Sequence, residues 1–593
     1  MTIHKRRIFA VKKLLGCLFH QRGDVDQNHS ECGTKISSAE NIKKKLNPFL
    51  RLYNSIIASN KQTSFALFAT IIFLQILFCI FSATEKRGYF IDEIYSLGLS
   101  NSKDYTFLNH SASSRDTWLN SDYFKQYLTV QNGERFSYTS VYRNQVADVH
   151  PPLYYFVLHT ICSFFPDSYS KWYGITLNII LFIIIQILLY KTSMLLTKNN
   201  ITVSAAILIF YGGTMLAIDN VLYIRMYEML TMFTMVTSLL HLKMFNSKVN
   251  FKRCIILFAV TFCGCMTQYY FGILAFFLSA IFCIHLLFCK KIKELFLYAG
   301  TMLLSIALFL FTFPAVFEHI FGGRRVGATT LNNALQITQL PEKCFSYMTQ
   351  FSRMIFTDNL HLAVLTVYAL FAIALLMLII LFKRRGKNIL TKSFDSDFWF
   401  LTISIALTFA TIALLAFDTH IRYMFFIHPL MVLLGMIFFT TLFTKIFCKN
   451  PQFINFSGHL ILLVSICASF NSVFLRKSSM LYNNEYHNME TLKAFSNCRG
   501  IFLVKNNSAP ALTQECRAVM QIKEVYCTEP SELKNLQKFL VPTTPLVVWI
   551  DKDKFWSSGF DSQEVTSKII NSGIYTRMQK LYSYGLVDCY IFK

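Results

Sequence analysis

Charged residues are scarce in this chain of 593 residues. They make up 15% of the sequence, whereas soluble domains carry about 25%. Apolar residues make up 54%, and phenylalanine alone occurs 59 times. The apolar residues gather in blocks of about the 20 residues that a membrane-spanning helix requires. The composition excludes an ordinary soluble domain and indicates a polytopic α-helical membrane protein.

The chain also lacks the residue spacings of common metal and redox sites. Its 16 cysteines and 14 histidines form no Cys-x-x-Cys or His-x-x-x-His pattern, so a zinc site of the usual spacing is not expected. Most of the cysteines lie in or near apolar blocks, where a thiol acts as a small apolar filler. Cys498, Cys516, Cys527 and Cys589 lie beyond these blocks and permit one or two disulfides, whose pairing the sequence leaves open.

Acidic residues are few beside basic ones, with 33 Asp and Glu against 57 Lys and Arg. The formal charge of +24 could suggest a nucleic-acid partner, but the basic residues lie mostly in short loops between apolar blocks and in residues 1–64. This placement follows the positive-inside rule, so we expect membrane lipids and no nucleic acid as partners. Residues 1–64 are interpreted as a basic cytoplasmic tail. Because no apolar core closely follows the first basic cluster, we expect targeting by an uncleaved first membrane helix.

Eleven membrane-spanning helices are predicted within a membrane domain of residues 65–475. If the N-terminus lies in the cytoplasm, every loop predicted on that side carries lysine, and the short connections on the opposite side carry neither lysine nor arginine. This alternation predicts the orientation and places the first extracytoplasmic loop, residues 84–171, outside the cytoplasm. The predicted spans are 65–83, 172–190, 202–219, 222–242, 254–271, 272–289, 295–321, 361–382, 398–417, 421–444 and 456–475.

One apolar block, Pro151–Phe165, is short for a span. As a helix it would measure about 23 Å, against an apolar slab of about 30 Å. Counting it as a span would place the lysine-rich loops outside. We therefore interpret it as a helix lying at the outer interface of the membrane, with Tyr154 and Tyr155 at the level of the lipid headgroups. A short true span is the alternative.

Polar residues and short β-rich runs return after the last predicted span. Residues 476–593 therefore predict a small extracytoplasmic α/β domain. Its strands are expected at Gly500–Lys505, Glu524–Cys527, Pro545–Ile550 and Cys589–Phe592, and its helices at Ser531–Phe539 and Ser562–Ser572.

Two adjacent carboxylates, Asp92 and Glu93, follow the first predicted span. Charge close to the apolar slab is costly and usually serves a function. The alternative is that the pair only marks the polar end of a helix. Asp148 and His150 are expected on the same face, just ahead of Pro151–Phe165. For His150 the alternative is a polar cap of that helix.

Two arginines are also expected at this face, where the positive-inside rule disfavours them. Arg225, followed by Tyr227, opens the fourth predicted span, and Arg422 opens the tenth. A phosphate is a natural partner for the fork of an arginine side chain. The alternatives are an ion pair of Arg225 with Glu228 and interfacial snorkelling of Arg422. His428 is interpreted as a histidine packed within the bundle rather than a ligand.

Taken in order, these motifs resemble those of the GT-C superfamily of membrane glycosyltransferases. They are Asp92-Glu93, Asp148-Val-His150-Pro-Pro-Leu-Tyr-Tyr, Arg225-Met-Tyr227 and Arg422-Tyr-Met-Phe-Phe-Ile-His-Pro429. Their order and rough spacing match over residues 65–475, most closely for the branch of protein O-mannosyltransferases and lipid A aminoarabinose transferases. Unlike eukaryotic protein mannosyltransferases, the chain has no inserted β-trefoil domain in residues 322–360, which argues against a protein acceptor.

The resemblance implies transfer of a single sugar from a polyprenyl-phosphate donor to an acceptor hydroxyl, by one inverting displacement. In this scheme Asp92 is the general base, and Glu93 orients the acceptor or holds a divalent cation if one is used. Arginine side chains stabilise the phosphate leaving group. The donor phosphate and sugar are expected to be bound by Arg225, Tyr227, Arg422, His150 and Asp148.

The resemblance leaves open the sugar and the class of acceptor, which is a lipid, a glycan or a protein. It implies a multi-pass protein of the bacterial inner membrane, with a cytoplasmic N-terminus and an extracytoplasmic C-terminal domain. One alternative is a transporter or flippase of a lipid-linked glycan, although such proteins often show internal repeats and broken helices that are not clear in this sequence. A glycan polymerase or ligase is the other alternative.

Overall fold

The computed structural model describes residues 61–103, 107–108, 117–322, 325–385, 393–447, 451–504, 509–528, 545–554 and 559–593. The chain divides into two compact units, residues 1–66 and 67–593. Nearly all of the predicted basic tail, residues 1–64, and the predicted helix Ser531–Phe539 lie outside the described residues. The candidate site lies in the second unit.

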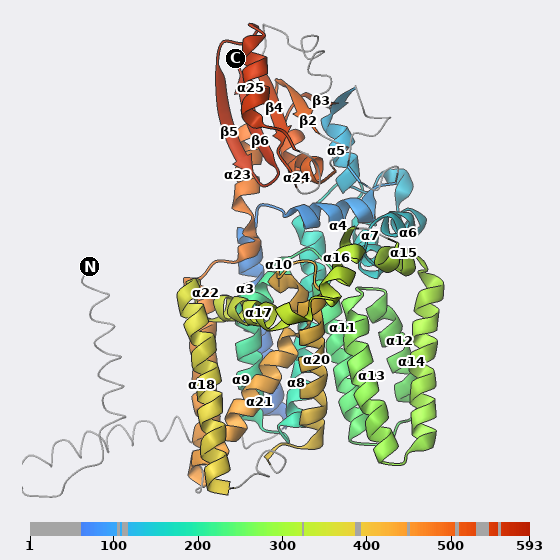
Figure 1. Ribbon diagram of the computed structural model, residues 1–593, viewed down its shortest axis with the longest axis vertical. Coiled ribbons are helices and arrows are strands. Elements are labelled where there is room, and N and C mark those ends of the chain that lie inside the picture. The colour runs from blue at the N-terminus through green and yellow to red at the C-terminus, as the bar shows by residue number, and fades with distance from the viewer. Residues whose placement is uncertain are drawn as a thin grey trace, which may run out of the picture. The chain divides into compact units, whose positions relative to one another are not determined.

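Each of the eleven predicted spans contains a helix, and these helices run side by side in a long bundle (Figure 1). Among the described residues, seven helices are long and apolar enough to cross a membrane, and an eighth span results if the bent pair α9–α10 counts as one. The protein is thus a polytopic α-helical membrane protein, and its predicted total of eleven spans stays a prediction. The bundle helices are α3 (Lys61–Glu85), α8 (Lys171–Leu196), α9 (Ile201–Gly212), α10 (Met215–Leu222), α11 (Tyr227–Phe245), α12 (Phe251–Cys265), α13 (Tyr270–Phe288), α14 (Ile292–Thr312), α18 (Leu360–Arg385), α20 (Ser396–Leu415), α21 (His428–Phe447) and α22 (Pro451–Leu475).

The third predicted span is broken where two glycines follow each other. Helices α9 and α10 meet there at an angle of 55°. A Cβ atom on Gly212 would lie 2.3 Å from the side-chain nitrogen of Gln186, and one on Gly213 would lie 2.0 Å from Oγ of Ser469. Glycine lets these side chains approach the backbone closely, so the break is built into the packing of the bundle.

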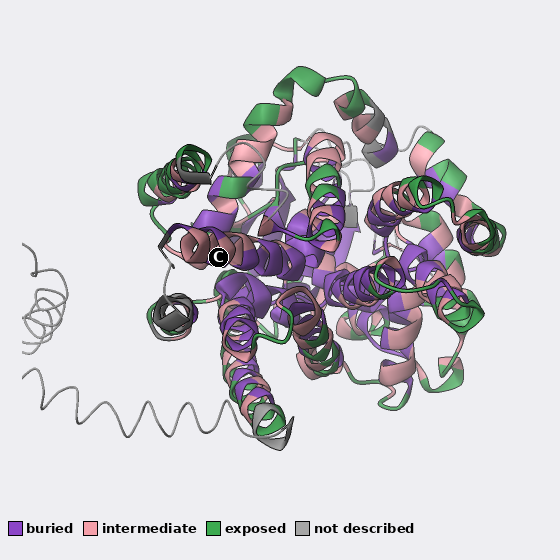
Figure 2. Ribbon diagram, turned by 90° about the horizontal axis from the view of Figure 1, so that it is seen from below, coloured by how far each residue is buried: buried purple, intermediate pink, exposed green. Residues whose placement is uncertain are grey.

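Buried side chains gather along the middle of the bundle, whereas exposed ones lie on its rim (Figure 2). Many of the exposed side chains are large and apolar, such as Phe371 of α18 at 71% and Phe311 of α14 at 86% exposure. Soluble monomers rarely expose continuous apolar surfaces of this kind. The rim therefore suits contact with lipid tails.

Short helices cover one end of the bundle, next to the C-terminal domain (Figure 1). The predicted interfacial helix is one of them, α7. Tyr154 and Tyr155 of this helix are fully buried, which corrects their expected place among the headgroups. The reason is that α7 packs against α4 and α6. The short helices are α4 (Ile91–Asn101), α6 (Tyr138–Ala147), α7 (Leu153–Ser163), α15 (Ala315–Phe321), α16 (Arg325–Ala334) and α17 (Leu340–Ile355).

The C-terminal residues form the expected α/β domain around a six-stranded sheet with the order β1-β3-β2-β4-β6-β5. Strands β3, β2 and β4 are parallel, and β5 and β6 are antiparallel. The four predicted runs correspond to β2, β3, β4 and β6, whereas β1 comes from the long segment between α3 and α8 and pairs with β3. The elements are β1 (Trp118–Asn120), α5 (Ser121–Leu128), α23 (Asn483–Lys493), β2 (Arg499–Leu503), α24 (Ala509–Val519), β3 (Glu524–Thr528), β4 (Leu546–Asp551), α25 (Ser562–Asn571), β5 (Met578–Tyr584) and β6 (Val587–Phe592).

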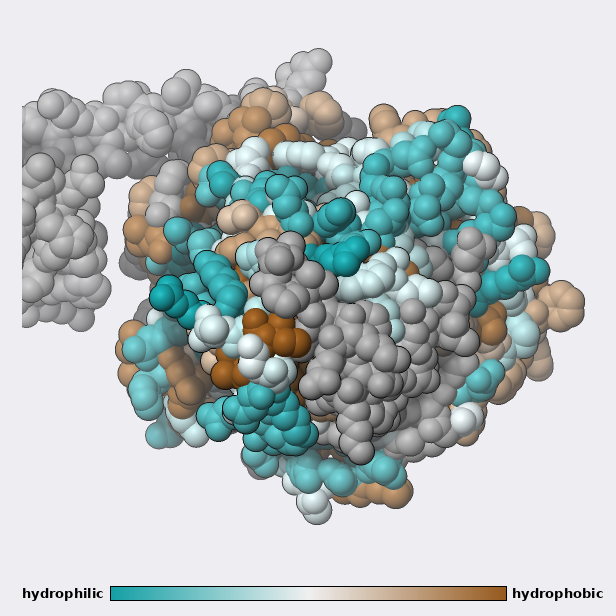
Figure 3. All heavy atoms as spheres, turned by 90° about the horizontal axis from the view of Figure 1, so that it is seen from above, coloured by the Kyte–Doolittle hydropathy of each residue, from teal (hydrophilic) through white to brown (hydrophobic). Residues whose placement is uncertain are grey.

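Viewed from the end that carries this domain, the molecule is largely hydrophilic, with hydrophobic residues showing around the rim (Figure 3). Within the domain, Cys516, Cys527 and Cys589 are buried and Cys498 is partly exposed. All four are free thiols in the structure. The sheet therefore holds together through its apolar core, and strand β4 is buried along its whole length.

Candidate active site

Asp92 lies in the first turn of α4, which follows α3 after a short link of residues 86–90. Phe90, the residue before the helix, has an extended backbone. The carboxylate of Glu93 accepts a hydrogen bond from the N–H of Phe90 at 2.8 Å. A carboxylate at this position satisfies a free N–H and interacts favourably with the helix dipole. These contacts start α4 at Ile91 and place Asp92 at the end of the bundle.

The carboxylate of Asp92 is held by two donors from distant parts of the chain. Its Oδ2 accepts hydrogen bonds from Nη1 of Arg422 at 2.6 Å and from the hydroxyl of Tyr223 at 2.7 Å. Arg422 belongs to the short 3₁₀ helix η3 (Ile421–Ile427), directly before α21. Tyr223 is the first residue after α10. Three segments of the chain therefore converge on one carboxylate.

Arg225 lies beside the same residue and contacts the segment between α3 and α8, which includes His150 and Tyr155. Its Nη2 lies 2.7 Å from Nε2 of His150, and its Nη1 donates to the hydroxyl of Tyr155 at 3.1 Å and to the backbone oxygen of Asp92 at 3.4 Å. Because arginine cannot accept a hydrogen bond, Nε2 of His150 is the acceptor. Burial, and then the charge of Arg225, lower the pKa of His150, which agrees with this neutral form.

The charges around Asp92 decide its protonation state. Burial raises the pKa of Asp92, but the charges of Arg422 and Arg225 outweigh burial and lower the pKa to about 2, with help from the Tyr223 hydroxyl. Asp92 is therefore a carboxylate throughout the physiological pH range. In this state the carboxylate accepts hydrogen bonds from Arg422 and Tyr223, which makes it a weak base.

Each arginine keeps one donor unused. Nε of Arg225 and Nε of Arg422 are buried and have no hydrogen-bond partner among the described residues. Buried donors are paired in the great majority of cases, so these two Nε atoms are available to an acceptor group of a ligand. An anion with several oxygens, such as a phosphate, is the kind of group that arginine forks bind.

Glu93 differs from Asp92 although the two are neighbours in sequence. Its side chain and that of Lys86 are both fully buried, and Nζ of Lys86 lies 3.0 Å from Oε2 of Glu93. The same oxygen accepts from the N–H of Phe90, and Oε1 accepts from the N–H of Ile224 at 2.9 Å. Both oxygens of Glu93 therefore already bind donors.

These contacts bear on the divalent cation considered for Glu93. Such a cation prefers several carboxylate or carbonyl oxygens that are free to coordinate it. The oxygens of Glu93 face a lysine and two backbone N–H groups instead. No group of three or more His, Cys, Asp or Glu side chains in the described part of the chain could hold a metal ion. The donor set at Glu93 does not fit a divalent cation.

Two further predicted residues lie around this centre. The ring of Tyr227 stacks on that of Tyr223, with centroids 5.9 Å apart and planes at 9°. Tyr227 thus supports the tyrosine that donates to Asp92. Asp148 ends α6, and its backbone N–H donates to the carbonyl of Asn144, which places it on the loop that carries His150.

The alternatives for Arg225 and the interpretation of His428 can also be compared with the structure. Glu228 accepts a hydrogen bond from Asn220, whereas the described contacts of Arg225 go to His150 and the other groups named above. His428 is buried in the bundle, with its ring centroid 5.2 Å from that of Tyr211. It lies apart from the centre around Asp92, as a bundle histidine would.

Sequence reasoning missed three residues that contact this centre. Tyr223 stands two positions before Arg225, and Tyr155 belongs to the Pro-Pro-Leu-Tyr-Tyr motif that follows His150. Closeness in sequence to these candidate residues could have indicated both tyrosines. Lys86 is a single lysine at the end of the first span, where an exposed position is the ordinary expectation. No local pattern distinguishes it from a surface lysine.

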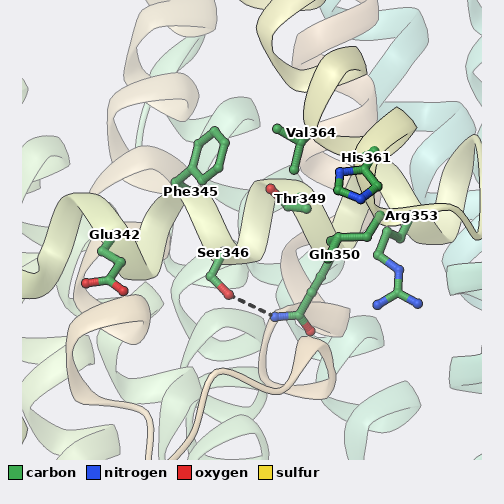
Figure 4. Close-up of a pocket in the computed structure, with 9 residues that line it drawn as sticks. Glu342, Phe345, Ser346, Thr349, Gln350, Arg353, His361 and Val364 are labelled. Carbon is green, nitrogen blue, oxygen red and sulfur yellow. Dashed lines mark hydrogen bonds between the residues drawn. The ribbon is translucent and has the colours of Figure 1, made fainter.

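A separate groove lies between α17 and the start of α18, with a volume of about 600 Å³. Figure 4 shows Ser346, Gln350 and Arg353 along α17, with His361 across the groove. The side chain of Gln350 donates to the carbonyl of Thr419 at 2.5 Å. The groove is thus next to the loop that leads into η3 and Arg422.

No protein-family model and no curated protein sequence matches this chain. Among solved structures, it is similar to ArnT from Cupriavidus metallidurans bound to undecaprenyl phosphate, with 8% identity over 88% of this chain and 97% of that one, at a TM-score of 0.45. ArnT from the same organism in the apo state is also similar, with 8% identity over 78% of this chain and 93% of that one, at a TM-score of 0.42.

The Archaeoglobus fulgidus oligosaccharyltransferase, tethered with an acceptor peptide, is also similar, with 11% identity over 84% of this chain and 72% of that one, at a TM-score of 0.39. Because identities and TM-scores are low, the function has to be derived from the chain's own residues.

Proposed function

We propose that this protein is a membrane glycosyltransferase that moves one sugar from a polyprenyl-phosphate donor to an acceptor hydroxyl on the extracytoplasmic face. One observation carries the proposal: Arg422 binds the Asp92 carboxylate, Arg225 binds the backbone oxygen of Asp92, and each arginine has a buried Nε without a hydrogen-bond partner among the described residues. A base and a cationic anion-binding pair are the two parts that such a displacement needs.

The arginines suit the leaving group of this reaction. When the bond between the anomeric carbon and the phosphate oxygen breaks, negative charge grows on the phosphate. Two guanidinium groups fixed in a partly buried site stabilise that charge more in the transition state than in the ground state. Neutral His150 holds Arg225 without competing for the anion, so the arginine charge remains available to the phosphate.

Donor binding also changes Asp92. A phosphate that binds Arg422 competes with the carboxylate for the same Nη1 donor, which lies 2.6 Å from Asp92 before the donor arrives. As the phosphate neutralises the arginine charges, the pKa of Asp92 rises towards its ordinary value of about 3.9. The freed carboxylate takes the proton of the acceptor hydroxyl while the hydroxyl oxygen attacks the anomeric carbon. This single displacement inverts the configuration at that carbon.

The chain's own groups are sufficient for this scheme, because no step in it requires the divalent cation for which the Glu93 donors are unsuited. The polyprenyl tail would lie along the apolar helices, and the acceptor would approach from the side of the C-terminal domain. The acceptor class, whether lipid, glycan or protein, is left open. The proposal includes a cytoplasmic N-terminus, which the charge distribution supports, and a location in a bacterial inner membrane, which the motifs support.

One structural observation favours the alternative of a transporter or flippase. The bent pair α9–α10 is a broken span, and secondary transporters often bind substrates at broken helices near the membrane midplane. The charged centre described above lies beyond the end of α10 instead, around Tyr223 and Arg225. A transporter would move an intact lipid-linked glycan without forming a glycosidic bond.

The Arg422→Met variant tests the proposal. We expect wild-type protein in lipid nanodiscs to transfer sugar from a panel of polyprenyl-phosphate sugars to lipid and glycan acceptors, measured by mass spectrometry of the products. Loss of one charged transition-state donor should lower kcat by roughly 10²–10³-fold.

Arg253→Met is the matched control, because the described hydrogen bonds of the Arg253 side chain go only to residues 243–248, at the end of α11 and in the loop after it. This variant should keep wild-type transfer. Transfer by Arg422→Met at the wild-type rate would contradict the assigned role, and vesicle translocation of an intact lipid-linked glycan without a new glycosidic bond would favour the transporter.

A further inference from the structure

The ion pair between Lys86 and Glu93 is fully buried beside the candidate active site. The exposure of both side chains is 0%, and the charged atoms lie 3.0 Å apart. Burying two charges is unfavourable unless their partners are well placed. A neutral pair would fill the same space without the free-energy cost of burying two charges. The groups that this ion pair holds in place therefore indicate its function.

Glu93 connects the two walls of the site, by which we mean the segment that carries Asp92 and the segment that carries Tyr223 and Arg225. Its Oε2 binds Lys86 and the N–H of Phe90 on the wall that carries Asp92. Its Oε1 accepts from the N–H of Ile224 on the opposite wall. Ile224 stands between Tyr223 and Arg225, the residues that contact Asp92 from that side. One carboxylate therefore sets how far the base lies from its donors.

Lys86 extends this connection to the C-terminal domain. Its Nζ donates to the carbonyl of Met480 at 2.5 Å and lies 4.8 Å from the ring centre of Tyr482. Two positions on, the N–H of Gly88 donates to the carbonyl of Leu481 at 3.1 Å. A Cβ atom on Gly88 would lie 1.8 Å from the backbone oxygen of Tyr482. The two backbones thus run in direct contact.

Residues 478–485, which we name the clasp, continue this contact on both sides. Glu485 accepts from the N–H of Tyr89 at 3.1 Å and pairs with Arg517 of α24 at 2.6 Å. At the other end, the hydroxyls of Ser478 and Ser479 donate to Asp219, near the end of α10, at 2.6 and 2.5 Å. The clasp therefore contacts the segments that precede both walls of the site.

We propose that Lys86 and Glu93 are positioning residues and that, together with the clasp of the C-terminal domain, they set the position of Asp92 relative to Tyr223 and Arg225. This inference rests on the proposed function of the site and deepens it. It makes the C-terminal domain a structural part of the active site. Displacement by about 1 Å can lower a rate by about 10²-fold, so a rigid, buried tie is of direct use here.

The Glu93→Gln variant tests the tie with little change in volume. An amide has one oxygen, so it can accept on only one wall, and its NH₂ group then faces a donor on the other. We expect kcat/KM for transfer in nanodiscs to fall by about 10²-fold. Binding of polyprenyl phosphate alone should weaken about tenfold, because Arg225 shifts relative to Arg422.

The double variant Lys86→Met with Glu93→Gln separates positioning from stability. It leaves no unpaired buried charge, so its thermal unfolding should recover towards wild type relative to Lys86→Met alone, while its kcat/KM stays low. Recovery of kcat/KM together with stability would overturn the inference, as would a well-folded Glu93→Gln with wild-type transfer and phosphate binding. The double variant also decides the matter if Glu93→Gln fails to fold.

Two further variants complete the experiment. Glu485→Gln alters the clasp and its ion pair with Arg517, and it should lower kcat/KM although Glu485 has no described contact with Asp92, Arg225 or Arg422. Lys552→Met, whose partner Asp588 lies within the sheet of the same domain at 3.0 Å, is the matched control and should keep wild-type kinetics. If wild type transfers no sugar, the proposed function fails, and the positioning role is then decided by polyprenyl-phosphate binding in the same variants.

Discussion

The Asp92→Asn variant should lose most of its sugar transfer while binding the donor at least as tightly as wild type. An amide cannot take a proton from the acceptor hydroxyl, and general-base catalysis contributes roughly 10²–10⁴-fold. The amide oxygen can still accept from Arg422 and Tyr223, so the site keeps its geometry. Because an amide competes less with phosphate for Arg422 than a carboxylate does, the dissociation constant for polyprenyl phosphate should stay equal or fall.

This divergence of kcat from donor affinity distinguishes a base from a residue that only binds. Single-turnover transfer and direct binding of polyprenyl phosphate measure the two quantities separately. Asp395→Asn is the control, since Asp395 is 57% exposed and pairs with Lys198 away from this site. Full transfer by Asp92→Asn would remove the base assignment, and a large loss of donor affinity would make Asp92 a binding residue.

The Lys86→Met variant should show the largest loss of stability. It leaves the Glu93 carboxylate buried with only two N–H donors and no cation, and it removes the donor to the Met480 carbonyl. Breaking a buried pair by removing one partner costs about 3–5 kcal/mol. We expect a clear drop in the unfolding temperature, which can be measured by tryptophan fluorescence of the protein in detergent.

An exposed ion pair supplies the comparison. Lys568 pairs with Glu564 on α25 with side chains 56% and 62% exposed, and exposed pairs contribute about 0–1 kcal/mol. Lys568→Met should therefore leave the unfolding temperature nearly unchanged. If Lys86→Met were equally harmless, the buried pair would be no constraint on the fold, and the connection between the C-terminal domain and Asp92 would lose its basis.

Sequence patterns predicted the membrane fold because they are local and strong. Apolar blocks of helical length located the bundle helices, and short β-rich runs located β2, β3, β4 and β6. They did not locate β1, because three residues of strand in a long loop carry no periodicity to recognise. The buried places of Tyr154 and Tyr155 also depend on packing against α4 and α6, which an interfacial helix in isolation would lack.

For the candidate site, the sequence predicted which residues take part but not which of them contact one another. Charge placement put Asp92, Arg225, Arg422 and His150 on one predicted face, and the structure brings these residues together: Arg422 binds the Asp92 carboxylate, and Arg225 binds His150 and the backbone oxygen of Asp92. The resemblance implied that Asp92 is the base and that Glu93 orients the acceptor or holds a cation, but the sequence could not show the different contacts of the two, because adjacent residues on a helix point in different directions. One carboxylate faces the arginines and the other faces a buried lysine.

The sequence by itself determined that this is a membrane protein with a C-terminal α/β domain and with charge gathered beside the first span, since hydropathy and charge are properties of each segment alone. Only the tertiary structure decided that Asp92 is the counter-ion of Arg422, 330 positions away, and that Lys86 donates to Met480, 394 positions away. Such contacts arise from the mutual packing of helices and sheet. No pattern within one segment encodes them, because each partner is defined by the element that folds against it.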